Sequence, residues 1–202
     1  MHEPFWEASY NDIDGAFLYK QGQPSAEIIE LASKLKPNST ILDIGCGDGR
    51  NAIFLAQQGF LVTAFDISDS GVKKLIHRSK KLNVSINAFV QDMISFDFVQ
   101  GYDLIITHGC MHLISKIDSF RLVRDIQDHT IESGFNVHAV FTDSIEPSED
   151  MKSLCKGLFK EGEIFELYKD WNIIVQKSYV LEDEHPGGIK HRHSINKIVA
   201  KR

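Results

Sequence analysis

The sequence predicts a single α/β domain built on a mostly parallel sheet, and three observations lead to this class. Short apolar runs alternate with stretches of helical period, which is the pattern of β-α-β units. A glycine-rich turn, Gly45 to Gly49, joins one apolar run to a helical stretch, as in nucleotide-binding sheets. The last two strand-like runs flank a turn at Pro186–Gly188, so we expect a terminal hairpin and one antiparallel strand.

The predicted helices begin at capping residues and end at helix breakers. One opens at Pro24 and Ser25 and stops at Pro37, and the helix after the glycine turn ends at Gly59. The others are a helix from Ser68 or Asp69 to Leu82, one capped by Asp118 that contains Ile131 and ends at Gly134, and a broken helical region over 147–168. The predicted strands cover 41–44, 61–65, 84–90, 102–107, 135–141, 171–181 and 194–200. We expect one domain over residues 1–202, with an N-terminal extension over 1–23 and a core over 24–202.

The glycine turn is the most informative feature for function. Gly45, Gly47 and Gly49 lack side chains, so a ligand can lie against their backbone. Their G-x-G-x-G spacing differs from the G-x-G-x-x-G of dinucleotide sites. Asp43 precedes the first glycine, where a carboxylate would repel a pyrophosphate and suit a ligand that carries an ammonium group. Asp66 ends the next strand, at the edge where doubly wound sheets bind their ligands, but a similar Asp binds ribose in NAD enzymes and does not discriminate.

The run D-I-G-C-G-D-G, Asp43 to Gly49, resembles motif I of the class I S-adenosylmethionine (SAM) methyltransferases. The resemblance implies a Rossmann-like fold with a seven-stranded, mostly parallel sheet, one antiparallel strand and helices on both faces. It implies SAM as the cofactor and S-adenosylhomocysteine as its product. It also implies that the glycine turn packs against the methionine part of SAM and that Asp66 accepts hydrogen bonds from both ribose hydroxyls.

Two further loops fall where the resemblance places cofactor contacts. Asp92 would approach the adenine amino group while Met93 packs on the ring, although Asp92 could instead cap a helix. Thr107 and His108 follow the fourth strand, where these enzymes contact SAM and substrate, although His108 could be a structural histidine. The expected cofactor-binding residues are Tyr10, Asp43, Gly45, Cys46, Gly47, Arg50, Asn51, Asp66, Ile67, Asp92, Met93, Thr107 and His108.

A narrower resemblance is to the tellurite-resistance protein B group of methyltransferases. It rests on Gly45 to Gly59, which includes an Arg-Asn pair after the glycines, on F-K-E-G-E (159–163) and on I-K-H-R-H (189–193). The resemblance implies methyl transfer to tellurite and selenium oxyanions or related soft nucleophiles such as thiols. That group carries a His-Arg pair and a further Arg, and His185 matches the His, but Pro186 and Gly188 stand at the arginine positions. The departure favours a small-molecule methyltransferase of similar build.

The histidines of E-H-P-G-G-I-K-H-R-H are the candidate substrate-side residues. A strand's period of two places His191 and His193 on one face, with Lys190 and Arg192 on the other. We expect His185 or His193 to line the substrate pocket, where a neutral imidazole accepts a proton. The catalytic candidates are therefore His185, Arg192 and His193. Three histidines could also bind a metal, but we expect none.

The N-terminal segment is rich in aromatic residues, and W-E-A-S-Y (6–10) resembles a lead-in that folds over SAM as a lid. We expect Tyr10 to make the lid contact; the alternative is that these aromatics cover a sheet edge. The expected mechanism holds the acceptor in line with the methyl group and needs no covalent intermediate. Within this scheme no cysteine is a nucleophile. Cys46 stands at a tolerant position of the cofactor loop, and Cys110 and Cys155 are small buried hydrophobes.

Composition excludes several other classes. A net charge of −6 leaves no electrostatic footprint for nucleic acid. No apolar run approaches the roughly 18 residues of a membrane span, and the acidic, aromatic N-terminus is no secretory signal. Three cysteines without C-x-x-C spacing indicate a reducing, cytoplasmic setting. We expect the protein to be a monomer or a homodimer. Two alternatives remain open. One is a SAM-binding module without catalysis. The other is a nicotinamide-dependent oxidoreductase, which is less favoured because the sequence has no Tyr-x-x-x-Lys pair after the fourth strand.

Overall fold

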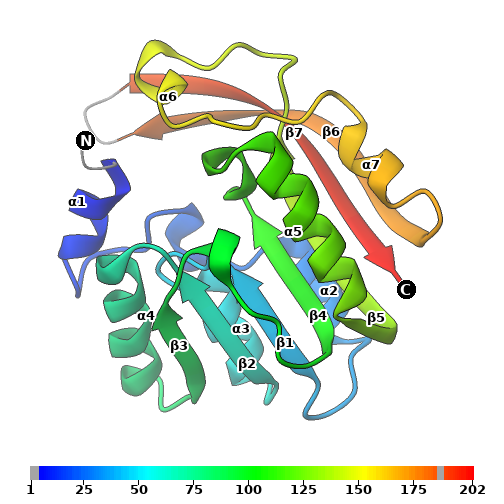
Figure 1. Cartoon of the computed structure of the whole chain (residues 1–202). Coiled ribbons are helices and arrows are strands. Elements are labelled where there is room, and N and C mark those ends of the chain that lie inside the picture. Colours follow the sequence, from blue (N-terminus) through cyan, green and yellow to red (C-terminus); the bar gives the residue numbers. More distant parts are fainter. Residues whose placement is uncertain (1–4, 186–188) are drawn as a thin grey trace. The chain divides into compact units, whose positions relative to one another are not determined.

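The structure, a computed structural model, describes residues 5–185 and 189–202 (Figure 1). The strands hydrogen-bond in the order β3-β2-β1-β4-β5-β7-β6. Their bounds are Thr40–Ile44 (β1), Leu61–Asp66 (β2), Ile86–Val90 (β3), Tyr102–His108 (β4), Thr130–Phe141 (β5), Asn172–His185 (β6) and Ile189–Lys201 (β7). The chain divides into two compact units, Met1–Asp97 with Tyr102–Leu104, and Phe98–Gly101 with Ile105–Arg202.

The strand directions confirm the predicted Rossmann-like α/β class. β1 pairs in parallel with β2, from Thr40 opposite Leu61 to Ile44 opposite Phe65, and β2 pairs in parallel with β3. β7 runs antiparallel to both β5 and β6, so it is the one antiparallel strand that the terminal hairpin predicts. The predicted turn at Pro186–Gly188 lies outside the described residues.

The first unit carries the glycine turn. Its helical elements are α1 (Phe5–Asn11), η1 (Lys20–Gly22), α2 (Ala26–Ala32), α3 (Arg50–Gln57), α4 (Asp69–Lys81) and η2 (Met93–Ser95). Ser68 caps α4 as predicted, because its hydroxyl accepts a hydrogen bond of 2.9 Å from the amide of Gly71. Ile41, Leu42 and Ile44 of β1 are fully buried, as expected of a central parallel strand. Helix α1 was not predicted, and it packs on α4 (Figure 1).

The second unit contains η3 (Met111–Leu113), α5 (Lys116–Asp128), α6 (Glu149–Lys152) and α7 (Glu163–Leu167). The prediction that Asp118 caps a helix ending at Gly134 is wrong at both ends. Ser115 is the cap, because its hydroxyl accepts from the amide of Asp118 at 3.2 Å. The helix stops at Asp128, where the hydroxyl of Thr130 donates to the carbonyl of Ile126 at 2.7 Å. Ile131 and Gly134 therefore belong to β5.

Three other predicted spans, one helical and two strand-forming, need correction. Only two short helices, α6 and α7, form within the predicted helical region 147–168. The strands of the hairpin extend past the predicted 171–181 and 194–200, because the ladder continues from Leu181 opposite His193 to His185 opposite Ile189. Backbone hydrogen bonds make this ladder, so polar side chains do not end it. No helix among the described residues is long and apolar enough to cross a bilayer.

Candidate cofactor-binding site

The glycine turn is held by backbone hydrogen bonds to the neighbouring strand. The amides of Gly45 and Cys46 both donate to the carbonyl of Phe65, at 2.9 and 3.0 Å. The φ angles of Gly45, Gly47 and Gly49 are +68°, +54° and +87°, which is the left-handed region that favours glycine. The turn therefore presents backbone at the carboxyl ends of β1 and β2. Burial raises the pKa of the Cys46 thiol, which fits a structural role.

Asp66 links this turn to helix α4. Its carboxylate accepts hydrogen bonds from the amide of Gly47 at 2.8 Å and from the amide of Ser68 at 2.9 Å. Burial raises the pKa of Asp66, and the same two amides oppose that shift. A carboxylate has about four acceptor positions, so these bonds leave it able to accept two hydroxyl donors as well. The arrangement is compatible with the predicted ribose contact, which remains a prediction.

Asp43 is the buried acid of the site, with 2% of its surface exposed. Burial raises the pKa of Asp43 to about 7, against the opposing charge of Arg50. A carboxyl group with this pKa is only half ionised at neutral pH. An ammonium group placed near it would favour the carboxylate form. The buried Asp43 therefore favours the binding of a cationic ligand.

Arg50 and Asn51, predicted to bind the cofactor, contact the segment before α2. The Arg50 guanidinium donates to the carbonyl of Gln23 at 3.0 Å and lies 5.1 Å from the ring centroid of Tyr19. The Asn51 side chain is 4% exposed, and its Oδ1 accepts from the amide of Ser25 at 3.1 Å. The Arg-Asn pair thus attaches residues 19–25 to the start of α3.

Tyr10 lies against the glycine turn, as the lid prediction requires. Its side chain is 9% exposed, and a methyl group built on Gly47 would come within 2.5 Å of its hydroxyl oxygen. A methyl group built on Gly71 of α4 would lie 3.2 Å from its ring. Burial raises the pKa of the Tyr10 hydroxyl, and the charge of Asp66 adds to the shift.

On the predicted adenine side, the structure shows Asp92 in its capping role. Its carboxylate accepts from the amide of Ile94 at 2.9 Å and so caps η2, which is the alternative stated above. Met93 is half-buried. Ile67, which follows β2, is 60% exposed, and Ile94 of η2 is 43% exposed. Exposed apolar side chains beside a capped turn offer a surface on which a flat aromatic ring can pack.

In the second unit, Thr107 begins a buried chain of hydrogen bonds. Its hydroxyl lies 2.7 Å from Nδ1 of His138, whose Nε2 lies 2.6 Å from the hydroxyl of Tyr168. Tyr168 donates to Asn136 at 2.9 Å, and Asn136 donates to Thr130 at 2.7 Å. Because Tyr168 donates onward, its oxygen accepts from His138, and Nδ1 of His138 then accepts from Thr107.

The ring of His138 is neutral in this chain. Burial, together with the nearby His108, lowers the pKa of His138 to about 3. His108 itself is half-buried. Sequence reasoning missed His138, because a histidine in an apolar strand gives no signal of its partners.

The C-terminal histidines form a stack of rings in the second unit. His193 is 6% exposed and lies on Phe141 with a centroid distance of 4.6 Å; His191 follows at 5.9 Å. His112 lies parallel to Phe141 at 4.1 Å, and burial lowers the pKa of His112 to about 3. The prediction that His191 and His193 share a face is confirmed. Arg192 is exposed and its Nε lies 3.8 Å from Glu182, while the side chain of His185 lies outside the described residues.

A small pocket lies beside His193. The residues that line it are Phe141, Thr142, Ile145, Pro147, Cys155, Leu158, His193 and Ser194. Cys110 is buried as predicted, but Cys155 is half-buried. Across the described parts of the chain, no group of three or more His, Cys, Asp or Glu side chains is placed to hold a metal ion.

The F-K-E-G-E block holds the loop before α7 to β7. The Glu161 carboxylate accepts from Asn196 at 2.7 Å and from Ser178 at 2.6 Å, with further hydroxyls of Thr142 and Ser144 at 3.1 and 3.0 Å. These donors lower the pKa of Glu161 to about 2. The block therefore has a structural role that its sequence alone does not reveal.

Comparison with known proteins identifies relatives along most of the chain. The family model described as tellurite resistance protein TehB matches residues 16–190. The probable S-adenosyl-L-methionine-dependent methyltransferase TehB of Haemophilus influenzae (strain 10810) is 28% identical over 150 residues, which are 73% of this chain and 51% of the relative. The chain thus spans about half the length of the curated relatives that it matches first.

Solved structures show the same fold. The crystal structure of TehB from Haemophilus influenzae has a TM-score of 0.79 at 21% identity and covers 88% of this chain and 62% of that one. Magnesium protoporphyrin IX methyltransferase from Synechocystis PCC 6803, solved with bound S-adenosylhomocysteine, has a TM-score of 0.63 at 16% identity, covering 96% of this chain and 92% of that one.

Proposed function

The chain belongs to the tellurite resistance protein TehB family, and we propose that it transfers the methyl group of SAM to a small-molecule acceptor. The observation that carries the proposal is the Asp66 carboxylate bound to the amide of Gly47 at 2.8 Å. This hydrogen bond holds a carboxylate beside the glycine backbone at the carboxyl ends of parallel strands, where sheets of this kind bind nucleosides.

The residues of the turn fit SAM by shape and by charge. A methyl group at Gly47 would fill the space beside Tyr10, so the cradle depends on glycine. Buried Asp43 favours a ligand with a cationic end, and Asp66 can accept hydroxyl donors. We assign Asp43 and the glycines to the methionine part, Asp66 to the ribose, and Ile67 with Met93 to the adenine. SAM supplies an activated methyl group, so the protein needs to position an acceptor and exclude water.

The acceptor that we propose carries a soft nucleophilic atom, such as a thiol or a selenium or tellurium oxyanion. Support for a thiol comes from the pocket beside His193, whose described lining contains no Lys or Arg to pair with an oxyanion. Pro186 and Gly188 likewise replace the basic residues that the family resemblance calls for. We assign His193 the role of accepting the proton of such a thiol.

An acceptor screen tests this function. Release of S-adenosylhomocysteine is measured with thiols, selenite, tellurite, amines and small acids, and we expect turnover with a thiol or with one of the oxyanions. Asp66→Ala should abolish turnover through loss of SAM binding, and Asp69→Ala, at an exposed position three residues away, is the matched control. SAM binding without release for any acceptor would support the non-catalytic module instead.

A further inference from the structure

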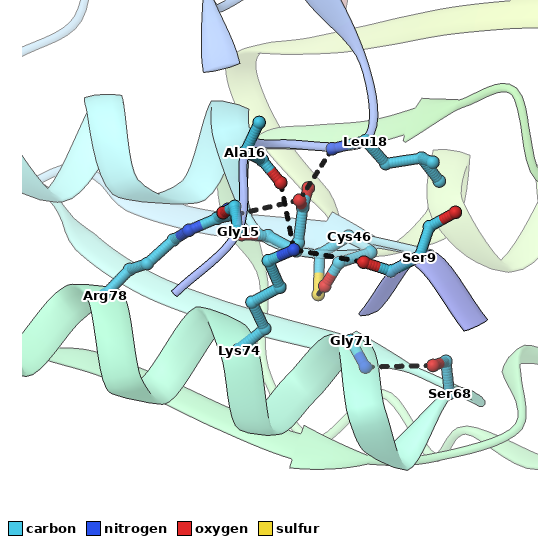
Figure 2. Close-up of polar contacts among 11 residues, drawn as sticks. Ser9, Gly15, Ala16, Leu18, Cys46, Ser68, Gly71, Lys74 and Arg78 are labelled. Atoms are coloured by element: carbon cyan, nitrogen blue, oxygen red, sulfur yellow. Dashed lines mark hydrogen bonds and ion pairs between the residues drawn. The ribbon is translucent and has the colours of Figure 1, made fainter. Parts of the chain in front are cut away.

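A strap formed by residues 9–18 is fastened to helix α4 and to the glycine turn by three charged side chains. Lys74 of α4 is 1% exposed, and its ammonium donates to the carbonyls of Ser9 and Ala16, at 3.2 and 2.9 Å (Figure 2). Burial lowers the pKa of Lys74. Holding a cation at a buried position costs free energy. If the position were needed only for packing, an apolar side chain would fill it without that cost. These contacts therefore call for an explanation beyond stability.

Arg78, one helical turn further along α4, reaches both the strap and the turn. Its guanidinium donates to the Asp48 carboxylate at 2.8 Å and to the carbonyl of Gly15 at 2.7 Å (Figure 2). It also lies 3.6 Å from the ring centroid of Phe17. The side chains of Arg78 and Asp48 are only 11% and 6% exposed, so solvent screens this pair weakly.

Asp48 makes the connection to the cofactor site, because it stands within the glycine turn. The same Oδ2 atom that accepts from Arg78 also accepts from the amide of Leu18 at 2.9 Å. Asp48 lies between Gly47 and Gly49, whose left-handed conformations shape the cradle. The strap in turn carries Tyr10, whose hydroxyl lies against Gly47. Strap and turn thus share one set of partly buried hydrogen bonds.

We propose that Lys74 and Arg78, acting with Asp48, are positioning residues that hold the strap closed over the bound cofactor and thereby set how fast SAM enters and leaves. The proposal rests on the proposed function, since it takes the glycine turn as the SAM site. Opening the strap breaks the bonds to Ser9, Gly15, Ala16 and Leu18 together and exposes two cations. We call the three side chains of Lys74, Arg78 and Asp48 the clasp. All four of their partners on the strap are backbone groups, so the clasp fixes the backbone conformation of the strap.

Stopped-flow measurement of SAM association and dissociation tests the clasp. In Lys74→Met and Arg78→Gln we expect both rate constants to rise by between about tenfold and a hundredfold, because each loses two or more charged hydrogen bonds to the strap or the turn. Lys73→Met, at the exposed neighbouring position of the same helix, should exchange SAM at the wild-type rates. A purely structural role would lower the melting temperature and leave the rates of the folded protein unchanged.

Hydrogen exchange of the wild-type chain gives an independent readout. The amide of Leu18 should be protected, further protected by SAM, and exposed in Arg78→Gln. Wild-type SAM exchange rates in both variants, or an unprotected Leu18 amide, would overturn the clasp while the proposed function stands. Absence of SAM binding to the wild-type chain would instead overturn the proposed function and the clasp's role with it.

Discussion

Replacing Gly47 by alanine tests the cradle, and Gly59 supplies a matched control. Both glycines have positive φ angles, +54° and +87°. An L-residue in this region costs about 1–2 kcal/mol, so Gly59→Ala should lower the free energy of unfolding by that amount and Gly47→Ala by at least that amount. A methyl group at Gly59 would meet no atom within 4 Å, whereas at Gly47 it would come within 2.5 Å of the Tyr10 hydroxyl.

Of the two variants, only Gly47→Ala would place its methyl group against Tyr10, a residue of the proposed SAM site. We expect its dissociation constant for SAM to rise at least about a hundredfold, equivalent to about 2.7 kcal/mol, while Gly59→Ala binds as the wild type does. Urea denaturation measures the stability of both variants, and isothermal titration calorimetry measures their affinity for SAM. Wild-type affinity in Gly47→Ala, or an equal loss in Gly59→Ala, would refute the placement of the site.

Three further changes test the packing and hydrogen bonds within each of the two units. Gly49→Ala should destabilise by about 3 kcal/mol or more, since its methyl group would lie 2.3 Å from Leu75 in addition to the cost of its φ angle; urea denaturation beside Gly59→Ala checks this. Tyr168→Phe leaves the buried N–H of His138 without its acceptor and should cost about 1–3 kcal/mol; an unchanged midpoint would contradict the hydrogen-bond chain. The pKa of Glu161 is lowered in the folded state from 4.5 to about 2, so its contribution to stability is present above about pH 4.5 and is lost as the pH falls towards 2. The wild type should therefore lose more stability over that range than Glu161→Gln, and parallel pH profiles would count against this.

The sequence was sufficient for features that depend on local patterns. β1 has an apolar run bounded by glycine, and α4 has a serine cap, so both were predicted from neighbouring residues. His191 and His193 share a face because a strand has a period of two. The parallel pairing of β1 with β2 and of β2 with β3 followed from the β-α-β pattern, and the antiparallel β7 followed from the terminal hairpin.

Features that depend on distant backbone were not predictable. Lys74 and Arg78 read as the polar face of an amphipathic helix, yet Lys74 is buried and Arg78 is half-buried because carbonyls of the strap approach them. Those carbonyls carry no sequence signal. His138 likewise depends on Tyr168, which lies 30 residues further along the chain. The end of α5 was misplaced because the hydroxyl of Thr130 closes the helix on Ile126, which competes with the apolar pattern that continues to Ile131.

Equilibrium titration of the wild-type chain with SAM, S-adenosylhomocysteine and NAD⁺ tests the central claim most directly. The geometry of Asp43, Gly47 and Asp66 predicts saturable binding of SAM and of S-adenosylhomocysteine at one site per chain, and no binding of NAD⁺ under the same conditions. Asp66→Ala should abolish both binding curves. Failure of SAM to bind, or a preference for NAD⁺, would contradict the account.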